Sequence, residues 1–265
     1  MINITIFSKN RACQLELLLR SIKEYFKDYD KFTFNILYKS TNDEFKKGYE
    51  KLFNIHPEFN YLQERSFKND VLSLMHNKNK FTVFFVDDNV FKNPFCMNCK
   101  KVKVFESDPD ILALSLRMYE KITYCYTMNK KESMPELTEG IWYWKNTGGA
   151  WGSSMSVDGH IFKTKDIKPI LKRIGFDYPN LMETGMKKNH IHKAKMICFD
   201  KGSKIFNIPL NKVQKYNNRF GKVSSEYLNN EFLKNKRISM SNIRNIENNS
   251  VHQEIDINFE GITYD

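Results

Sequence analysis

The sequence predicts an α/β fold with a mainly parallel sheet that is covered by helices on both faces. Segments with strand character alternate with segments of helical periodicity through the first third of the chain, a pattern typical of βαβ units. One strand, FTVFFV at 81–86, shows no regular alternation of polar and apolar residues, as expected when both faces of a central strand are covered. The 265 residues suffice for one large domain with a sizeable core.

The first half of the chain supplies the elements of this sheet in order. Residues 2–8 (INITIFS) are rich in β-branched and aromatic residues, and residues 14–26 carry apolar side chains at helical spacing after a short loop. The next strand, the next helix and a third helix before the 81–86 strand are predicted at 32–40, 43–56 and 71–78.

The second half is less regular. Residues 110–118 and 158–164 have strand character, a helix follows the second of them, and the polar residues 127–140 are predicted to form a surface loop. From composition we expect one large domain at 1–220 and a small helical C-terminal extension at 221–265 that packs on it.

Composition narrows the classes of protein. A hydrophobic content of 41% and an aromatic content of 14% exclude a disordered chain. The net charge of +11 favours anionic partners. The lysines are scattered, however, and the chain carries no nucleic-acid-binding motif, so we expect no nucleic-acid partner.

The cysteines and the N-terminal residues indicate the compartment. The five cysteines are odd in number, and the chain starts without a positive-then-apolar leader, which fits a cytoplasmic protein. Cys96 and Cys99 are expected to be free thiols, because no second Cys or His pair lies at zinc spacing. No apolar run approaches the roughly 20 residues of a membrane span, so any membrane contact would be peripheral.

The 81–86 strand ends at two acids, Asp87 and Asp88. Ligands of open α/β sheets bind beyond the carboxyl ends of the strands. Buried carboxylates need compensation, and a divalent cation such as Mn²⁺ or Mg²⁺ would supply it while leaving positions for substrate phosphates. The alternative is that the two acids only cap the following turn.

The segment FFVDDNVF resembles the acidic motif of GT-A glycosyltransferases, especially those of family 2. The resemblance implies a GT-A (Rossmann-like) fold with a mixed, mainly parallel sheet. It also implies that Asp88 and Asn89 bind the metal, and that Asp87 faces the donor ribose or sugar.

Other segments are similar to the nucleotide-contacting segments of that family. TIFSKNRACQ resembles its opening strand and loop, and ERSFKNDVLSLM resembles the segment before the acidic motif. Each residue also has an ordinary alternative, such as a helix cap, a core position or a solvated charge. The residues implied to bind the nucleotide are Ser8, Lys9, Arg11, Tyr38, Phe67, Lys68 and Asp70.

An inverting transfer requires a general base on the acceptor side. Glu183, in PNLMET at the start of a predicted helix, lies where family 2 enzymes often carry an acidic catalytic residue. Asp158 is beside a glycine that could approach the donor sugar closely. We assign Glu183 as the base and Asp158 as a donor-sugar contact, with the exchange of these roles as the alternative. His160 is expected to be structural.

Two further polar segments follow Glu183. By the same resemblance, Arg219 or Lys222 would neutralise the charge of the departing diphosphate. The alternative is a basic, Asn-rich turn. His190 and His192 alternate as strand neighbours would and are weaker candidates for a metal ligand.

The resemblance thus implies a hexosyl- or related transferase. Its donor would be a nucleotide-diphospho-sugar and its acceptor a hydroxyl of a glycan or lipid-linked saccharide, with inversion expected. One alternative is a nucleotidyltransferase, which is disfavoured because FSKNRACQ lacks the glycines of a phosphate loop. The other alternative is a non-catalytic carbohydrate- or nucleic-acid-binding protein. The basic charge and the aromatic segment WYWKNTGGAW favour it.

Overall fold

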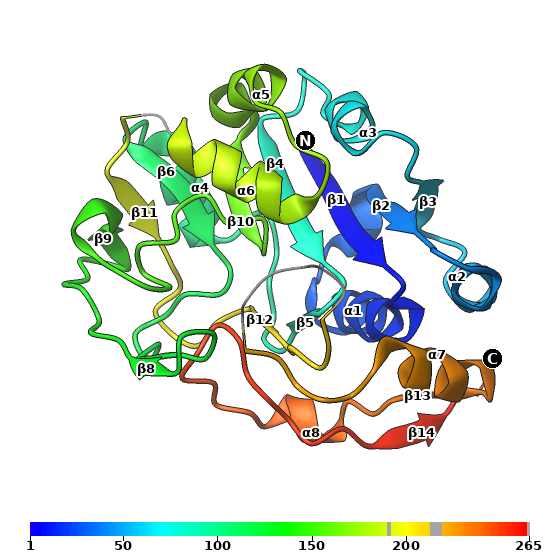
Figure 1. Ribbon diagram of the computed structural model, residues 1–265. Coiled ribbons are helices and arrows are strands. Elements are labelled where there is room, and N and C mark those ends of the chain that lie inside the picture. Colours follow the sequence, from blue (N-terminus) through cyan, green and yellow to red (C-terminus); the bar gives the residue numbers. More distant parts are fainter. Residues whose placement is uncertain (190–191, 213–218, 264–265) are drawn as a thin grey trace.

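The computed structural model describes residues 1–189, 192–212 and 219–263. Its centre is an eight-stranded sheet with the order β3-β2-β1-β4-β10-β6-β11-β9 (Figure 1). The strands of this sheet are β1 (Ile2–Lys9), β2 (Phe34–Lys39), β3 (Asn60–Gln63), β4 (Phe81–Val86), β6 (Ile111–Ser115), β9 (Ile141–Tyr143), β10 (His160–Lys163) and β11 (Lys195–Ile197).

One half of the sheet is parallel and the other is mixed. Strands β3, β2, β1 and β4 all pair in parallel, while β10 lies antiparallel between β4 and β6. Strand β11 is parallel to β6 and antiparallel to β9. Strands β1, β4 and β6 therefore end at the same edge of the sheet. The predicted α/β fold with a mixed, mainly parallel sheet is confirmed.

Helices cover both faces of the sheet (Figure 1). Alternate residues of the central strands point to opposite faces, so Ile6 and Phe85 join one apolar cluster and Phe7 and Phe84 join the other. The first cluster is covered by α1 (Ala12–Tyr25), α2 (Asp43–Ile55) and α4 (Lys100–Ser107), and the second by α3 (Phe67–Leu74), α5 (Thr164–Arg173) and α6 (Pro179–Lys188).

Short strand pairs and turns complete this part of the chain. Strand β5 (Asn89–Phe91) continues from β4 and pairs with β12 (Ile205–Asn207). The segment 127–140, predicted as a loop, contains β8 (Lys130–Lys131), which pairs with β7 (Tyr124–Cys125) just before that segment. Two 3-10 helices lie at Tyr29–Lys31 and Trp144–Asn146.

The third helix differs from its prediction at 71–78. Helix α3 starts earlier, because Asp70 accepts hydrogen bonds from the backbone N–H groups of Arg65 and Ser66 at its beginning. It ends at Leu74, and the side chain of Asn3 binds the backbone N–H of His76 beyond that end. Tertiary hydrogen bonds with β1 thus set this boundary.

The C-terminal residues are less helical than predicted. They contain α7 (Ser225–Leu233) and α8 (Ser241–Arg244), but also the antiparallel pair β13 (Lys236–Ile238) and β14 (Phe259–Gly261). Buried side chains of α7 and β13 join the apolar cluster beneath α1 and α2. Residues before β14 run back along β12, where His252 forms a β-bridge with Asn207.

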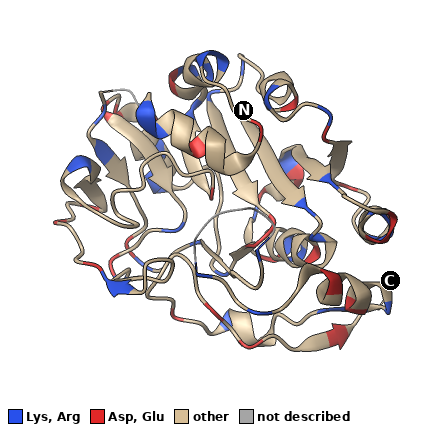
Figure 2. Cartoon of the chain, in the orientation of Figure 1, with Lys and Arg blue, Asp and Glu red and all other residues tan. Residues whose placement is uncertain are grey.

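The surface carries its positive charge broadly. Figure 2 shows Lys and Arg on helices, strands and loops rather than on a single element. All five cysteines are free, as expected for Cys96 and Cys99. Within the described part of the chain, no helix combines the length and the apolar character that crossing a bilayer would require.

Candidate active site

A cavity of about 640 Å³ opens at the edge of the sheet where β1 and β4 end. The position agrees with the rule that ligands of α/β sheets bind beyond the carboxyl ends of the strands. Most of the residues singled out from the sequence line it: Ser8, Lys9, Arg11, Phe67, Asp87, Asp88, Asp158, Glu183 and Arg219.

Asp87 joins the end of β4 to the loop after β1. Its carboxylate accepts hydrogen bonds from the backbone N–H of Lys9 at 3.0 Å and from the Arg11 guanidinium at 2.9 Å. The Arg11 side chain is only 9% exposed. Burial opposes its charge, but Asp87 and Asp88 outweigh that effect and raise the pKa of Arg11. The ion pair therefore fixes the floor of the cavity.

Arg11 also reaches the segment after β12. Its Nε donates to the side-chain oxygen of Asn211 at 2.7 Å and its second amino group donates to the Asn211 carbonyl at 2.6 Å. The Asn211 amide in turn donates to Gln14 on α1. Because the guanidinium is used in these internal bonds, its role in the cavity is to hold Asp87 and residue 211 together.

Ser8 is also engaged within the protein. Its hydroxyl lies 2.7 Å from the hydroxyl of Tyr49 on α2. The same Tyr49 oxygen accepts from the backbone N–H of Arg11. These bonds position the loop after β1 against α2.

Asp88 has weaker compensation than Asp87. One carboxylate oxygen accepts from the Asn207 amide at 2.8 Å, and the other lies 3.6 Å from Arg11. Burial raises the pKa of Asp88 to about 7, and the neighbouring Asp158 and Asp87 add to this although Arg11 opposes it. The Asp88 side chain is 16% exposed, so this carboxylate is half-buried and only partly paired.

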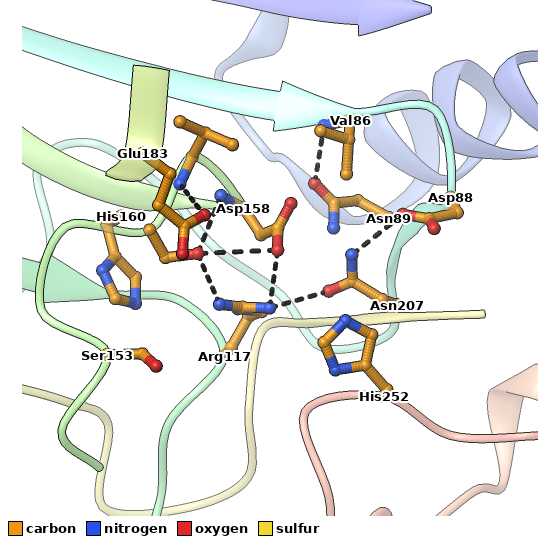
Figure 3. Close-up of polar contacts among 12 residues, drawn as sticks. Val86, Asp88, Asn89, Arg117, Ser153, Asp158, His160, Glu183, Asn207 and His252 are labelled. Carbon is orange, nitrogen blue, oxygen red and sulfur yellow. Dashed lines mark hydrogen bonds and ion pairs between the residues drawn. The ribbon is translucent and has the colours of Figure 1, made fainter. Parts of the chain in front are cut away.

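Asp158 pairs with a second buried arginine. Its carboxylate accepts from Arg117 at 2.9 Å, and Arg117 lies just beyond the end of β6 with a side chain that is 5% exposed. The other amino group of Arg117 donates to the Ser156 hydroxyl at 2.7 Å. Figure 3 shows Arg117 beneath Asp158 and beside Asn207.

Glu183 lies next to Asp158 at the cavity wall (Figure 3). It projects from α6, and one of its oxygens is 3.4 Å from the backbone nitrogen of Val157. The other oxygen pairs with Lys187 at 2.8 Å. Its side chain is 22% exposed, so this carboxylate is reachable from the cavity.

Two histidines are held neutral near the site. Burial, with the nearby Arg117 as a smaller cause, lowers the pKa of both His160 and His252 to about 3. The His160 ring is enclosed, with its Nδ1 3.4 Å from the Ser154 carbonyl. This fits the structural role expected for it. His252 lines the cavity and presents a neutral imidazole there.

Two residues predicted to contact the nucleotide lie outside the cavity. Tyr38 packs on Tyr49 and Phe53 of α2, with ring centroids 4.7 and 5.3 Å away, because that side of β2 faces the helix. Lys68 donates to the backbone carbonyls of Lys172 and Ile174 and thereby binds the end of α5.

Two more predicted residues also have other local roles. Asp70, predicted to read a base edge, binds backbone N–H groups at the start of α3. Asn89, predicted to bind metal beside Asp88, is 1% exposed, and its side-chain oxygen accepts from the backbone N–H of Val86. Asn89 thus closes the turn between β4 and β5. A side chain does cap this turn, but it is that of Asn89 and not that of Asp87 or Asp88.

The structure describes all but one of the later candidate residues. Arg219 lines the cavity, stacks 4.4 Å from the ring centre of Tyr126 and donates to the Tyr124 hydroxyl. His192 is exposed, and His190 lies outside the described residues. Among the described residues, no group of three or more His, Cys, Asp or Glu side chains is placed to hold a metal.

Sequence reasoning missed Arg117 and Asn207, which bind the carboxylates, and His252, which lines the cavity. It noted Asn211 only as part of the Asn-rich polar segment, and the structure shows that Asn211 binds Arg11. The position of Arg117 directly after a buried strand was a usable signal, since β6 ends at the same edge as β4. Asn207 and His252 carried none, because their contribution depends on where the C-terminal residues return to the sheet.

Comparison with known proteins gives one sequence match. The bifunctional glycosyltransferase pgtA of Dictyostelium discoideum is 26% identical over 250 residues. The match covers 80% of this chain but 32% of pgtA, so the chain spans about a third of that relative's length. No protein-family model matches the chain.

Solved structures show more distant similarities. The mannosyltransferase PcManGT from Pyrobaculum calidifontis, in complex with GDP-Man and Mn²⁺, is 13% identical, with a TM-score of 0.40 over 76% of this chain and 55% of its own. S. aureus TarS is 13% identical, with a TM-score of 0.47 over 79% of this chain and 37% of its own. Both scores are below 0.5, so these two similarities do not extend to function. The sequence similarity to pgtA confirms that the chain resembles glycosyltransferases.

Proposed function

We propose that this chain is a metal-dependent glycosyltransferase that moves a sugar from a nucleotide-diphospho-sugar to a hydroxyl of a glycan or lipid-linked saccharide, with inversion. The observation that carries this proposal is the incompletely paired, half-buried carboxylate of Asp88, which lines the cavity at the carboxyl end of β4. The similarity to pgtA supports the reaction class.

The charges around Asp88 fit a divalent cation. Arg11 and Arg117 each pair with a flanking carboxylate, Asp87 and Asp158, and this leaves Asp88 with one amide and a longer contact. Mn²⁺ and Mg²⁺ are often held by one or two carboxylates, with water and phosphate oxygens in the remaining positions. Asp88 is the proposed ligand, and His252, which lines the same cavity, is a further candidate. When bound, the ion would stabilise the negative charge of the departing diphosphate.

Glu183 is the proposed general base. The acceptor hydroxyl would transfer its proton to Glu183 as its oxygen bonds to the anomeric carbon, and the bond from that carbon to the diphosphate oxygen would break. The carboxylate is accessible, and its partner Lys187 has a side chain that is 44% exposed and can be displaced. Asp158 is already bound by the buried Arg117 and is therefore the better donor-sugar contact.

The remaining cavity residues suit a nucleotide diphosphate. Lys9 and Phe67 line the side of the cavity formed by β1 and α3, and we assign them to the nucleotide together with Ser8 and Asp87. Arg219 and Lys212 also line the cavity. Their positive charge supports a role in binding the diphosphate and stabilising it as it departs.

Calorimetric titration tests this function. UDP, GDP and their sugar conjugates would be titrated into the protein with Mn²⁺ and after chelation. We expect one nucleotide to bind only with metal, and we expect Asp88→Ala to abolish that binding. Asp70→Ala is the matched control, because this carboxylate lies outside the cavity and should leave binding unchanged. Metal-independent binding, or no binding to any nucleotide, would instead favour a non-catalytic binding protein.

A further inference from the structure

The guanidinium of Arg117 binds three acceptors from two segments, 156–158 and the end of β12. One amino group lies 2.9 Å from Asp158 and 3.1 Å from the side-chain oxygen of Asn207, and the other donates to Ser156. Its Nε has no hydrogen-bond partner among the described residues. Arg117 does not line the cavity, whereas Asp158 and Asn207 do. Arg117 therefore acts on the cavity through other residues.

Asn207 provides the next connection. Its oxygen accepts from Arg117, and its amide nitrogen donates to Asp88 at 2.8 Å. An asparagine side chain accepts at one end and donates at the other, so its orientation is fixed by the two charged neighbours. Its backbone is held between β5 and the His252 segment.

We propose that Arg117 and Asn207 form a positioning relay that fixes the donor-sugar carboxylate, Asp158, relative to the proposed metal ligand, Asp88. The inference rests on the function proposed above, because it assigns the relay to the two ends of one donor molecule. Hydrogen bonds run from Asp88 through Asn207 and Arg117 to Asp158 without a break (Figure 3).

The relay would keep the metal ligand and the sugar contact at a fixed separation. The metal-bound diphosphate and the sugar are joined by the bond that breaks, so their protein contacts must keep a fixed separation. A displacement of about 1 Å at a reacting centre can cost about 100-fold in rate. Asp88 is held from two sides, because its other oxygen faces Arg11. Arg117 thus determines the sugar side and Arg11 the nucleotide side.

The test measures Mn²⁺ affinity by calorimetry, with UDP present in one arm and GDP in the other, beside turnover. Arg117→Met should weaken Mn²⁺ binding about 10- to 100-fold, as changes behind metal ligands commonly do, and should lower kcat by more than it changes the donor KM. Arg117→Lys should recover part of both losses, because a lysine can pair with Asp158 but cannot bridge Ser156 and Asn207 at once.

A double variant separates the relay from general loosening. Asn207→Leu should weaken Mn²⁺ binding by itself, and adding Arg117→Met should then cause no further loss of Mn²⁺ affinity. Arg20→Met is the matched control, because Arg20 is also largely buried but pairs with Glu16 and Glu260 away from the cavity. Its Mn²⁺ affinity should equal that of the unmodified protein.

The outcomes distinguish the relay from the proposed function. If Asp88→Ala loses Mn²⁺ binding while Arg117→Met retains it, the relay is wrong and the metal site stands. If the losses of Arg117→Met and Asn207→Leu multiply, the two residues act separately and the relay is also wrong. If Asp88→Ala binds Mn²⁺ normally, the metal site is wrong and the relay falls with it.

Discussion

The two ends of strand β4 both open into cavities, and they are built differently. At the carboxyl end, the cavity of about 640 Å³ contains buried carboxylates and arginines joined by side-chain hydrogen bonds. At the amino end, a cavity of about 770 Å³ lies beside Phe81, between α5 and the residues around α4. It is lined by lysines: Lys78, Lys80, Lys163, Lys165, Lys168 and Lys172.

The lysines at the amino end are not joined to one another through side-chain partners. Lys163 donates to the carbonyl of Asp108, Lys168 donates to the carbonyl of Met75, and Lys80 pairs with Glu106. Burial and neighbouring lysines lower the pKa of Lys163 and of Lys168. The other four lysines, Lys78, Lys80, Lys165 and Lys172, are exposed, so the larger cavity is a mostly solvated basic surface. The two cavities thus differ in how their side chains are held: those of the proposed site are fixed by several partners each, and the lysines of the larger cavity are not.

Among the substitutions that test this comparison, we expect the one at Glu183 to have the largest effect on turnover. Glu183→Gln should lower kcat about 100- to 10,000-fold, because the amide cannot accept the acceptor proton. Nucleotide affinity measured by calorimetry should stay near that of the unmodified protein. Lys187→Ala is the control, since it removes the partner of Glu183 while leaving the carboxylate. Normal turnover in Glu183→Gln would transfer the role of base to another group.

An intermediate effect is expected at Arg11. Arg11→Met should lower the free energy of unfolding by about 3–5 kcal/mol, because it leaves Asp87 buried without its partner. Urea denaturation measures this change. The comparison is Arg244→Met, whose exposed pair with Glu24 should contribute at most about 1 kcal/mol. Equal losses in the two variants would show that Arg11 does not organise the carboxyl end.

The smallest effect is expected at the amino end. The exposed Lys165 and Lys172 line its cavity. Replacing both by alanine should change turnover by less than about twofold and the free energy of unfolding by about 0.5 kcal/mol or less, as is usual for surface positions. Steady-state kinetics and urea denaturation check the two values. A tenfold loss of turnover would make this basic surface part of the functional site and end the contrast between the two cavities.

The sequence predicted parts of the fold whose causes are local. The strand at 81–86 and the acids that end it depend on residue types within one short segment, so Asp87 and Asp88 were placed correctly at the cavity. The prediction that Tyr38 and Asp70 contact the nucleotide does not match their positions, because packing determines where these side chains point. Tyr38 faces α2, and Asp70 binds the start of its own helix. A single sequence does not show which face of a loop or strand a side chain will take.

By itself, the sequence determined the α/β class, the order of strands and helices as far as β4, and the two acids that end β4, because periodicity and strand ends are local properties. Only the tertiary structure decided which side chains hold the carboxylates. Arg117 and Asn207 are separated by 90 residues and Asn207 and Asp88 by 119. Their contacts exist because antiparallel β10 brings β6 beside β4, and because the β5–β12 pair and the C-terminal residues return to that edge.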